Sequence, residues 1–374
     1  MASICYATMT PVSMGIGIER VRTPLNHHPD HTDELIGGLP EDLGLECLTR
    51  LSYTAHGVAS RVCRRWCHLL QSRDFYCHRQ RSGFTRKVAC LVQALPSQAS
   101  PDGRKYGGGV VPTYKITVFD PVDGSWDRID PGPYPNGLPL FCQLASCDGK
   151  LVVMGGWDPV SYDPLTDVYV YDFTSCRWEK RAPMPARCSF FAAAGSSIDG
   201  RVYVAGGHDE GKNALRSAWA YDVRRDAWAE LTPMGQARDE CEGLVIGREF
   251  WVVSGYATER QGEFEGSAEV YDVDSGVWRR VDGAWERSQC PRSCVGAGKK
   301  GGIVSWAEVD PKVRVGMCVV AMGPVALVSG AQYQGGPHGF YLAWAGDGKK
   351  GDFERVTVPE EYSGYVQSGC CVEI

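Results

Sequence analysis

The 374-residue sequence has no long, uninterrupted hydrophobic run and no excess of basic charge. Its most membrane-like stretch is the uncharged segment 315–331, which Gly323-Pro324 divides, whereas about 20 apolar residues in a row are needed to cross a bilayer. A formal net charge of −6 leaves no basic footprint for nucleic acid or an anionic membrane surface. We therefore predict no nucleic-acid partner and no membrane association, and residues 315–331 are expected to form two buried strands around a turn.

The sequence also lacks the usual catalytic motifs. No phosphate loop, nucleophile elbow or zinc-protease motif is present. Most of the 16 cysteines fall in apolar patterns, where we expect small buried side chains in a reducing compartment. Two cysteine pairs with i,i+4 spacing could suit zinc, but neither has a second pair of ligands nearby. They are Cys63 with Cys67 and Cys290 with Cys294. We predict no catalytic residue, no metal and no other cofactor.

A repeat of about 50 residues organises most of the chain. Each full copy has an apolar run that ends in glycine, a polar loop, an alternating run that ends in an aromatic residue and Asp, and then a Trp. A weaker copy lacks the glycine pair but keeps Phe119-Asp120 and Trp126. The tryptophans stand at positions 126, 178, 228 and 278, so the steps are 52, 50 and 50 residues. Because the repeat contains short alternating strands and no helical pattern, it predicts the blades of an antiparallel β-propeller.

The propeller is expected to occupy residues 86–374. Its first blade begins near residue 88, directly after a helical region, and so lacks an inner strand; residues 365–372 are the expected donor of that strand. After Trp278 the repeat degrades, and the two next candidate second strands, 302–306 and 325–330, lie only about half a period apart. We predict six blades with a shortened fifth, and five blades is the alternative.

The glycine pair followed by spaced Tyr and Trp, such as Gly206-Gly207, Tyr221 and Trp228, resembles the kelch repeat. The likeness is specific over roughly three copies. Some kelch-like propellers are copper oxidases, which need at least two histidines near the central axis. Of the eight histidines only His208 and His338 fall in the predicted propeller, both in loops after glycines. We therefore expect no copper site.

Residues 1–34 and 35–85 precede the propeller. The first segment is mixed and contains proline, and we expect a disordered tail; its histidines, His27, His28 and His31, could bind a metal, although a solvated tail is favoured. The second segment has helical periodicity. It begins at Leu39-Pro40 and carries two apolar stripes, the first from residue 43 to 51 and the second from residue 58 to 70.

The spacing of the apolar residues in segment 35–85 resembles the F-box. In that family these helices dock on the Skp-type adaptor of SCF ubiquitin ligases, and the resemblance implies the same contact here. The implied adaptor-binding residues are Leu39, Pro40, Leu43, Leu48, Leu51, Val62, Trp66 and Leu69. The alternative is a helical cap that packs on the propeller, because a unit of about 45 residues is small for an independent core.

From residue 39 to 374 the sequence resembles plant F-box/kelch-repeat proteins. The resemblance implies a non-catalytic, substrate-recognition subunit of an SCF-type ligase in the cytoplasm, the nucleus or both. Its F-box would recruit the adaptor and, through it, cullin, while the propeller would bind the protein to be ubiquitinated and degraded by the proteasome. One branch of that group targets phenylalanine ammonia-lyase and other regulators of phenylpropanoid metabolism. The alternative is a kelch scaffold outside ubiquitination.

The predicted loops differ between the two faces of the propeller. Connections from second to third strands are long and those from third to fourth strands are tight, and in a meander these sets emerge on opposite faces. Long loops on a rigid scaffold usually carry recognition. The predicted substrate-binding residues on this face are Arg187, Arg238, Arg292, Trp157, His208 and Tyr256. The arginines would suit an acidic patch on the partner, and the alternative is that each pairs within its own blade.

Overall fold

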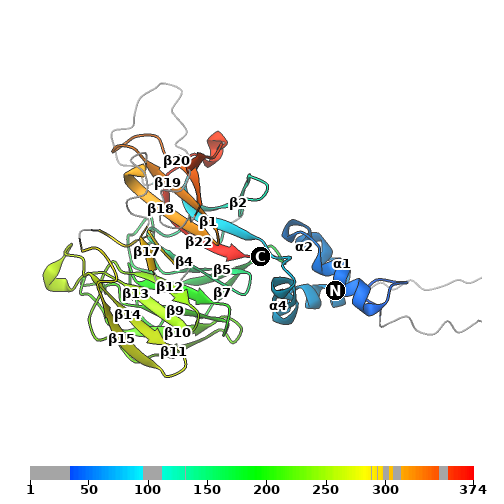
Figure 1. The fold of residues 1–374 in the computed structure, drawn as a ribbon, viewed down its shortest axis with the longest axis horizontal. Coiled ribbons are helices and arrows are strands. Elements are labelled where there is room, and N and C mark those ends of the chain that lie inside the picture. The colour runs from blue at the N-terminus through cyan, green and yellow to red at the C-terminus, as the bar shows by residue number, and fades with distance from the viewer. Residues whose placement is uncertain are drawn as a thin grey trace, which may run out of the picture. The chain divides into compact units, whose positions relative to one another are not determined.

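The computed structural model describes residues 34–95, 112–130, 132–287, 289–292, 294–297, 303–305, 313–344 and 353–374. The predicted tail, apart from Glu34, lies outside these residues, and so do its three histidines. The chain divides into two compact units, residues 1–45 and 46–374. In the described part, α-helices occur between residues 41 and 81, and strands follow from residue 87 onward (Figure 1).

Four short helices form the N-terminal region, and side-chain caps set where two of them begin. The Cys63 thiol accepts a hydrogen bond from the amide of Trp66 over 3.4 Å, and the Ser72 hydroxyl accepts one from Phe75 over 3.2 Å. The first cap divides the apolar stripe predicted for residues 58–70 between two helices. The helices are α1 (Glu41–Thr49), α2 (Tyr53–Ala59), α3 (Arg64–Leu70) and α4 (Arg73–Arg81).

Five four-stranded antiparallel sheets and one two-stranded sheet follow among the described residues. The four-stranded sheets have the orders β22-β1-β2-β3, β4-β5-β6-β7, β8-β9-β10-β11, β12-β13-β14-β15 and β18-β19-β20-β21, and the short sheet is β16-β17. The strands are β1 (Lys87–Ala94), β2 (Tyr114–Asp120), β3 (Ser125–Arg128), β4 (Gln143–Cys147), β5 (Lys150–Met154), β6 (Val168–Asp172), β7 (Arg177–Arg181), β8 (Ala192–Ser196), β9 (Arg201–Ala205), β10 (Ala218–Asp222), β11 (Ala227–Glu230), β12 (Glu242–Ile246), β13 (Glu249–Val253), β14 (Ser267–Asp272), β15 (Val277–Asp282), β16 (Val295–Ala297), β17 (Ile303–Ser305), β18 (Val315–Met322), β19 (Val325–Ala331), β20 (Gly339–Trp344), β21 (Phe353–Arg355) and β22 (Val366–Glu373).

The sheets form a β-propeller whose innermost strands contact one another in a ring. The order of contact is β22, β4, β8, β12, β16, β18 and again β22. The mainly β fold with a small helical region is therefore confirmed. Within the described residues the propeller has five four-stranded blades, which is the predicted alternative. The two-stranded sheet β16-β17 lies between β12 and β18, where the sequence predicted the shortened module.

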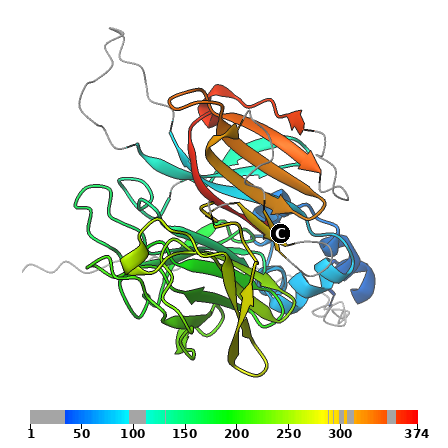
Figure 2. The ribbon, with the colours of Figure 1, turned by 60° about the vertical axis from the view of Figure 1, so that its left-hand side comes forward.

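The C-terminal strand completes the first blade, as predicted. Strand β22 pairs antiparallel with β1, from Lys87 opposite Glu373 to Gln93 opposite Val366. Figures 1 and 2 show this strand in red beside the cyan β1. The uncharged segment 315–331 forms β18 and β19, which confirms the two strands expected there. The ends of the chain's β-region therefore close the ring through one shared sheet.

Tyrosine and tryptophan side chains hold neighbouring blades together. Tyr221 on β10 lies opposite Trp228 on β11, with ring centroids 4.9 Å apart. Tyr221 is fully buried in a cluster that includes Val152 and Val170 of the preceding blade. The Trp228 indole donates a hydrogen bond of 3.0 Å to the carbonyl of Ala182, in the connection that follows that blade. The repeated Tyr and Trp therefore place the core between blades, where aromatic pairs add about 0.5–1.5 kcal/mol beyond their area burial.

Candidate functional site

The long loops gather on one face of the propeller, which we call the long-loop face. Loops 155–167, 206–217 and 254–266 join second to third strands, and each meets the connection that precedes an inner strand. Isolated β-bridges join each loop to that connection, at Leu140–Trp157, Ser189–His208 and Asp239–Tyr256. Gly207 has φ +79°, and a Cβ there would lie 2.3 Å from the carbonyl oxygen of Ser189. The second glycine of the pair is therefore required for this close approach of two backbones.

Four aromatic rings from three modules meet on this face. We call Phe141, Trp157, Phe190 and His208 the aromatic cluster. The ring centroids of Phe141 and Phe190 lie 4.9 Å apart, and that of Trp157 lies 5.6 Å from Phe141. His208 stacks on Phe190 at 5.3 Å. Because Phe141, Trp157 and Phe190 are only half-buried, the cluster offers apolar and aromatic surface to a partner.

Phe141 and Phe190 were not predicted as site residues. Both have φ +58°, and Glu240 has φ +47° at the matching point of the next module. Bulky residues rarely adopt positive φ, and such backbone often accompanies function. The signal in the sequence was the spacing: each of the three residues lies two positions before the start of an inner strand, and they lie 49 and 50 residues apart. The repeat of this position was not recognised, because two of its members are Phe and the third is Glu.

Arg187 and Arg238 do not occupy matching positions. The bridge residues Ser189 and Asp239 mark the same point of successive modules. Arg187 precedes Ser189 by two residues, whereas Arg238 precedes Asp239 by one. Side chains on extended backbone alternate between two directions, so a slip of one residue reverses the side to which a side chain points. Accordingly Arg187 is exposed and Arg238 is buried.

Arg238 supports the propeller from inside. Its exposed fraction is 0%, and its Nε donates to Glu269 Oε1 over 3.2 Å. Nη1 donates to the carbonyl of Ser254 at 2.8 Å and Nη2 to the hydroxyl of Ser267 at 2.8 Å. The Glu269 carboxylate also accepts two backbone amides of the connection before β12. This burial corrects the prediction that Arg238 contacts a substrate, because the guanidinium does not reach the surface.

The other two predicted arginines are accessible. Arg187 is 59% exposed and pairs with Glu210 at 3.0 Å, an exposed pair that contributes at most about 1 kcal/mol. Arg292 is half-buried, and its guanidinium carbon lies 4.3 Å from the ring centroid of Phe190. This is the geometry of a cation–π contact. Of the three arginines, Arg292 is the one that joins the aromatic cluster.

His208 and Tyr256 lie below the surface of the long-loop face. His208 is 8% exposed, and its Nδ1 lies 2.9 Å from Asp239 Oδ1. Tyr256 is 5% exposed and donates its hydroxyl to Glu240 Oε1 over 3.0 Å. Burial raises the pKa of Tyr256, so the phenol stays protonated and acts as the donor. Both side chains brace the loops, and of the three predicted anchors Trp157 presents the most accessible ring.

The predicted adaptor-binding residues differ in exposure. In the unit 1–45, Leu39 is half-buried, Pro40 is exposed and Leu43 is 50% exposed. In the unit 46–374, Leu48 is 1% exposed and belongs to the core, whereas Val62 is 62% exposed. The half-buried members are Leu51, Trp66 and Leu69. Leu48 therefore stabilises the helices from inside, and the accessible apolar surface comes from its neighbours.

Neither a metal centre nor a membrane-spanning helix is found among the described residues. Within them, no group of three or more His, Cys, Asp or Glu side chains is arranged to hold a metal ion. The helices found between residues 41 and 81 are all too short and too polar to cross a bilayer, and the rest of the described chain adds none that could.

Two family profiles match the sequence. An F-box domain profile matches residues 36–78, and a KLHDC2/KLHL20/DRC7 Kelch-repeats domain profile matches residues 103–299. Among Arabidopsis thaliana proteins, F-box/kelch-repeat protein At2g44130 is 39% identical over 302 residues, which cover 75% of this chain and 73% of that protein. F-box/kelch-repeat protein At1g15670 is 35% identical over 367 residues, 91% of this chain and 100% of that protein. The chain belongs to the F-box/kelch-repeat proteins. The resemblance to the plant members of that family is thereby confirmed.

In this F-box/kelch-repeat protein, helices α2–α4 contact the propeller on the side opposite the long-loop face. Arg73 on α4 reaches turns of two blades: its Nε donates to Asp148 Oδ2 over 2.7 Å and its Nη2 to the carbonyl of Ser197 over 2.7 Å. On α2, a Cβ at Gly57 would lie 3.0 Å from the sulfur of Cys176. These contacts come from first-to-second and third-to-fourth strand turns. Helices α2–α4 therefore contact the face of the propeller opposite the long-loop face.

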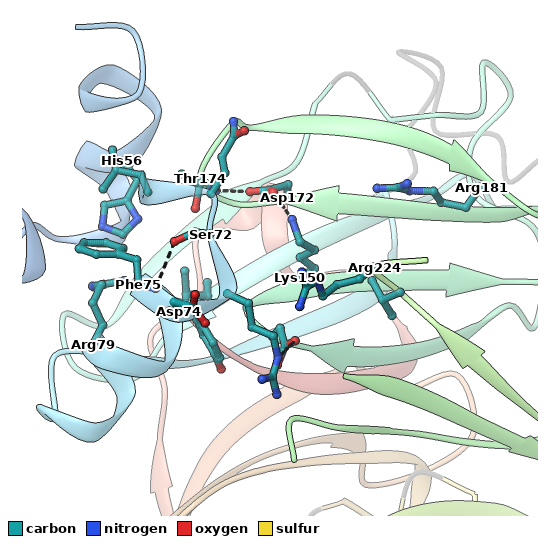
Figure 3. Close-up of a pocket in the computed structure, with 18 residues that line it drawn as sticks. His56, Ser72, Asp74, Phe75, Arg79, Lys150, Asp172, Thr174, Arg181 and Arg224 are labelled. Carbon is teal, nitrogen blue, oxygen red and sulfur yellow. Dashed lines mark hydrogen bonds and ion pairs between the residues drawn. The ribbon is translucent and has the colours of Figure 1, made fainter. Parts of the chain in front are cut away.

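A cleft of about 320 Å³ lies between helices α2–α4 and these turns. Figure 3 shows Lys150 paired with Asp172 on the propeller side, and His56 beside Phe75 and Arg79 on the helical side. Burial, together with the nearby Arg79 guanidinium acting in the same direction, lowers the pKa of His56 to about 4. Burial also raises the pKa of the Asp148 carboxyl, against the pull of Arg73. The contact between helices α2–α4 and the propeller turns is thus polar, and it includes the ion pairs Arg73–Asp148 and Lys150–Asp172.

Proposed function

We propose that this chain is the substrate-receptor subunit of an SCF-type ubiquitin ligase. The observation that carries the proposal is the combination of an F-box with a kelch propeller whose accessible aromatic cluster lies on the face away from helices α2–α4. One chain would thereby hold two protein partners at once, an adaptor at the F-box and a target at the long-loop face. Such an arrangement suits a receptor.

The proposed role requires no bond-making residue in this chain. A Skp-type adaptor bound to the F-box would recruit cullin and, through it, the ubiquitin-conjugating enzyme. The propeller would hold the target close to that enzyme, and proximity would accelerate ubiquitin transfer. Ubiquitination would then direct the target to the proteasome, in the cytoplasm, the nucleus or both.

Exposed apolar side chains support the adaptor contact. Pro40 and Leu43 are accessible in the unit 1–45, and Val58 and Val62 are 71% and 62% exposed in the unit 46–374. Large apolar residues at the surface commonly mark protein-binding sites, and a few of them carry most of the binding free energy. Val58 was not among the predicted contacts. The proposed adaptor contacts are Leu39, Pro40 and Leu43 in the unit 1–45, and Leu51, Val58, Val62, Trp66 and Leu69 in the unit 46–374.

The proposed substrate surface is the aromatic cluster with Arg187 and Arg292. Phenylalanine ammonia-lyase is the substrate we propose to test first. Plant cells expressing the intact chain should contain less of this enzyme, and more of its ubiquitinated form under proteasome inhibition, than cells expressing a Leu39→Ala, Pro40→Ala variant. If adaptor binding is intact and another protein is ubiquitinated instead, the receptor role holds and this substrate is rejected.

A kelch scaffold with a helical cap is the second candidate. The contacts of Arg73 with the turns of two blades favour it, because they show helices α2–α4 packed on the propeller as a cap would be. The two candidates differ in what they require of the F-box surface. A scaffold needs no adaptor, so failure of the purified chain to bind any Skp-type adaptor would favour the second candidate.

A further inference from the structure

A shallow depression of about 600 Å³ lies beside the aromatic cluster. It is lined by Arg187, Asp209, Glu210 and Gly211. Asp209 directly follows His208, a member of the cluster, so the depression and the aromatic rings share one loop. Hydrogen bonds from the backbone and side chain of Asn213 hold the pKa of Asp209 below its ordinary value. The depression therefore presents two carboxylates and one guanidinium.

The surrounding loops extend this negative charge. Loops 155–167, 206–217 and 254–266 together contain eight Asp and Glu residues but only three Lys and Arg residues. Asp163, Glu259 and Glu263 are exposed, and no basic side chain in the described part of the chain forms an ion pair with them. Three nearby arginines already pair within the chain, Arg187 with Glu210, Arg238 with Glu269 and Arg260 with Glu265. Lys212 and Arg216 form no ion pair among the described residues, and they leave the three loops with an excess of five acidic side chains, eight minus three. The long-loop face is therefore acidic around its aromatic centre.

The aromatic cluster itself accepts a guanidinium. Arg292 lies over the ring of Phe190 at 4.3 Å, so this ring already holds a guanidinium of the chain itself. Phe141 and Trp157 are half-buried, and among the described residues no Lys or Arg lies over either ring. Aromatic faces beside ionised carboxylates attract both the planar charge and the aliphatic stem of arginine. The surface is thus complementary to a basic segment.

We propose that a basic segment of the protein substrate docks on this surface. A Lys or Arg side chain of the segment enters the depression against Asp209 and Glu210, competing with Arg187 for Glu210. A neighbouring apolar or aromatic side chain of the segment packs on Phe141 and Trp157. The inference rests on the proposed function and gives the chemistry of its substrate. It reverses the acidic partner predicted from the arginines, because two of those three are neutralised within the chain.

Two fluorescein-labelled peptides test the proposal on the full chain. One alternates Arg, Trp and Ser residues, and its twin has Glu in place of every Arg. At 50 mM salt we expect the Arg peptide to bind at least tenfold more tightly by fluorescence anisotropy. The difference should shrink at 500 mM salt, because the screening length falls below about 5 Å. Tighter binding of the Glu peptide, equal binding of the two, or binding of neither would overturn the proposal.

Matched variants locate the contact. Asp209→Asn with Glu210→Gln should weaken the Arg peptide at least fivefold, with circular dichroism showing an intact propeller. The control is Asp74→Asn with Glu354→Gln, which removes the same formal charge from two exposed carboxylates on α4 and β21. An equal loss in the control would mean that net charge alone attracts the peptide, and the proposed surface would be rejected. Adaptor binding, measured separately, reports on the receptor role and does not depend on either peptide.

Discussion

Replacing Arg238 by Met tests whether this side chain supports the fold. Methionine keeps much of the length but removes the charge, and it would leave Glu269, whose side chain is 4% exposed, without its guanidinium partner. Loss of one member of a buried ion pair commonly costs about 3–5 kcal/mol. Because Glu269 keeps two backbone hydrogen bonds, we expect a loss of about 3 kcal/mol in the free energy of unfolding.

Equilibrium unfolding in guanidinium chloride measures the effect of Arg238→Met, and Arg187→Met is the matched control. The control removes an exposed ion pair with Glu210, so its loss should stay below about 1 kcal/mol. Adding Glu269→Gln to Arg238→Met should recover part of the stability, because the buried carboxylate charge is removed with its partner. Equal losses for the two single variants would refute the reasoning from register and burial.

Three further changes test other parts of the fold. Deleting residues 364–374 removes β22 and exposes the edge of β1, so the truncated chain should aggregate, and one that melts like the intact chain would contradict closure by this strand. Gly207→Ala places a Cβ 2.3 Å from the Ser189 carbonyl oxygen at φ +79°, and its unfolding free energy should fall by about 1–3 kcal/mol; an unchanged value would mean that the backbones can separate. His56 has a folded pKa of about 4, below the ordinary value near 6.5, so the folded state binds fewer protons and stability should fall between pH 6.5 and pH 4. A His56→Gln variant should lose less over that window, and an identical pH profile would count against a buried neutral imidazole.

Repetition made the propeller predictable from sequence. Because an aromatic residue followed by Asp and then a Trp recur in four successive modules, the period of the tryptophans identifies those blades even where the glycine pair is missing. The closing strand was predictable from the number of strands in the first module. That module begins directly after the helical region and has only three strands, so its inner strand must come from elsewhere in the chain. The division of the stripe from residue 58 to 70 into two helices was missed, because it depends on a single cap at Cys63.

The site was harder to predict because it depends on register. Arg187 and Arg238 recur at nearly the same point of successive modules, Arg187 one residue before Cys188 and Arg238 three before Cys241, yet a one-residue slip relative to Ser189 and Asp239 points them in different directions. A repeat length known only as about 50 residues does not fix the register of a side chain to within one residue. Phe141 and Phe190 were missed for another reason: rings from different modules approach within 4.9 Å only in the closed ring, so no local pattern reveals the cluster.

Adaptor binding is the most direct measurement of the receptor role. The purified full chain should bind a plant Skp-type adaptor in isothermal titration calorimetry, and the Leu39→Ala, Pro40→Ala variant should bind at least about thirtyfold more weakly, as expected for a contact worth about 2 kcal/mol or more. A Phe141→Ala, Trp157→Ala variant, altered on the long-loop face, should bind the adaptor with unchanged affinity. No binding by the intact chain, or undiminished binding by the Leu39→Ala, Pro40→Ala variant, would contradict the account.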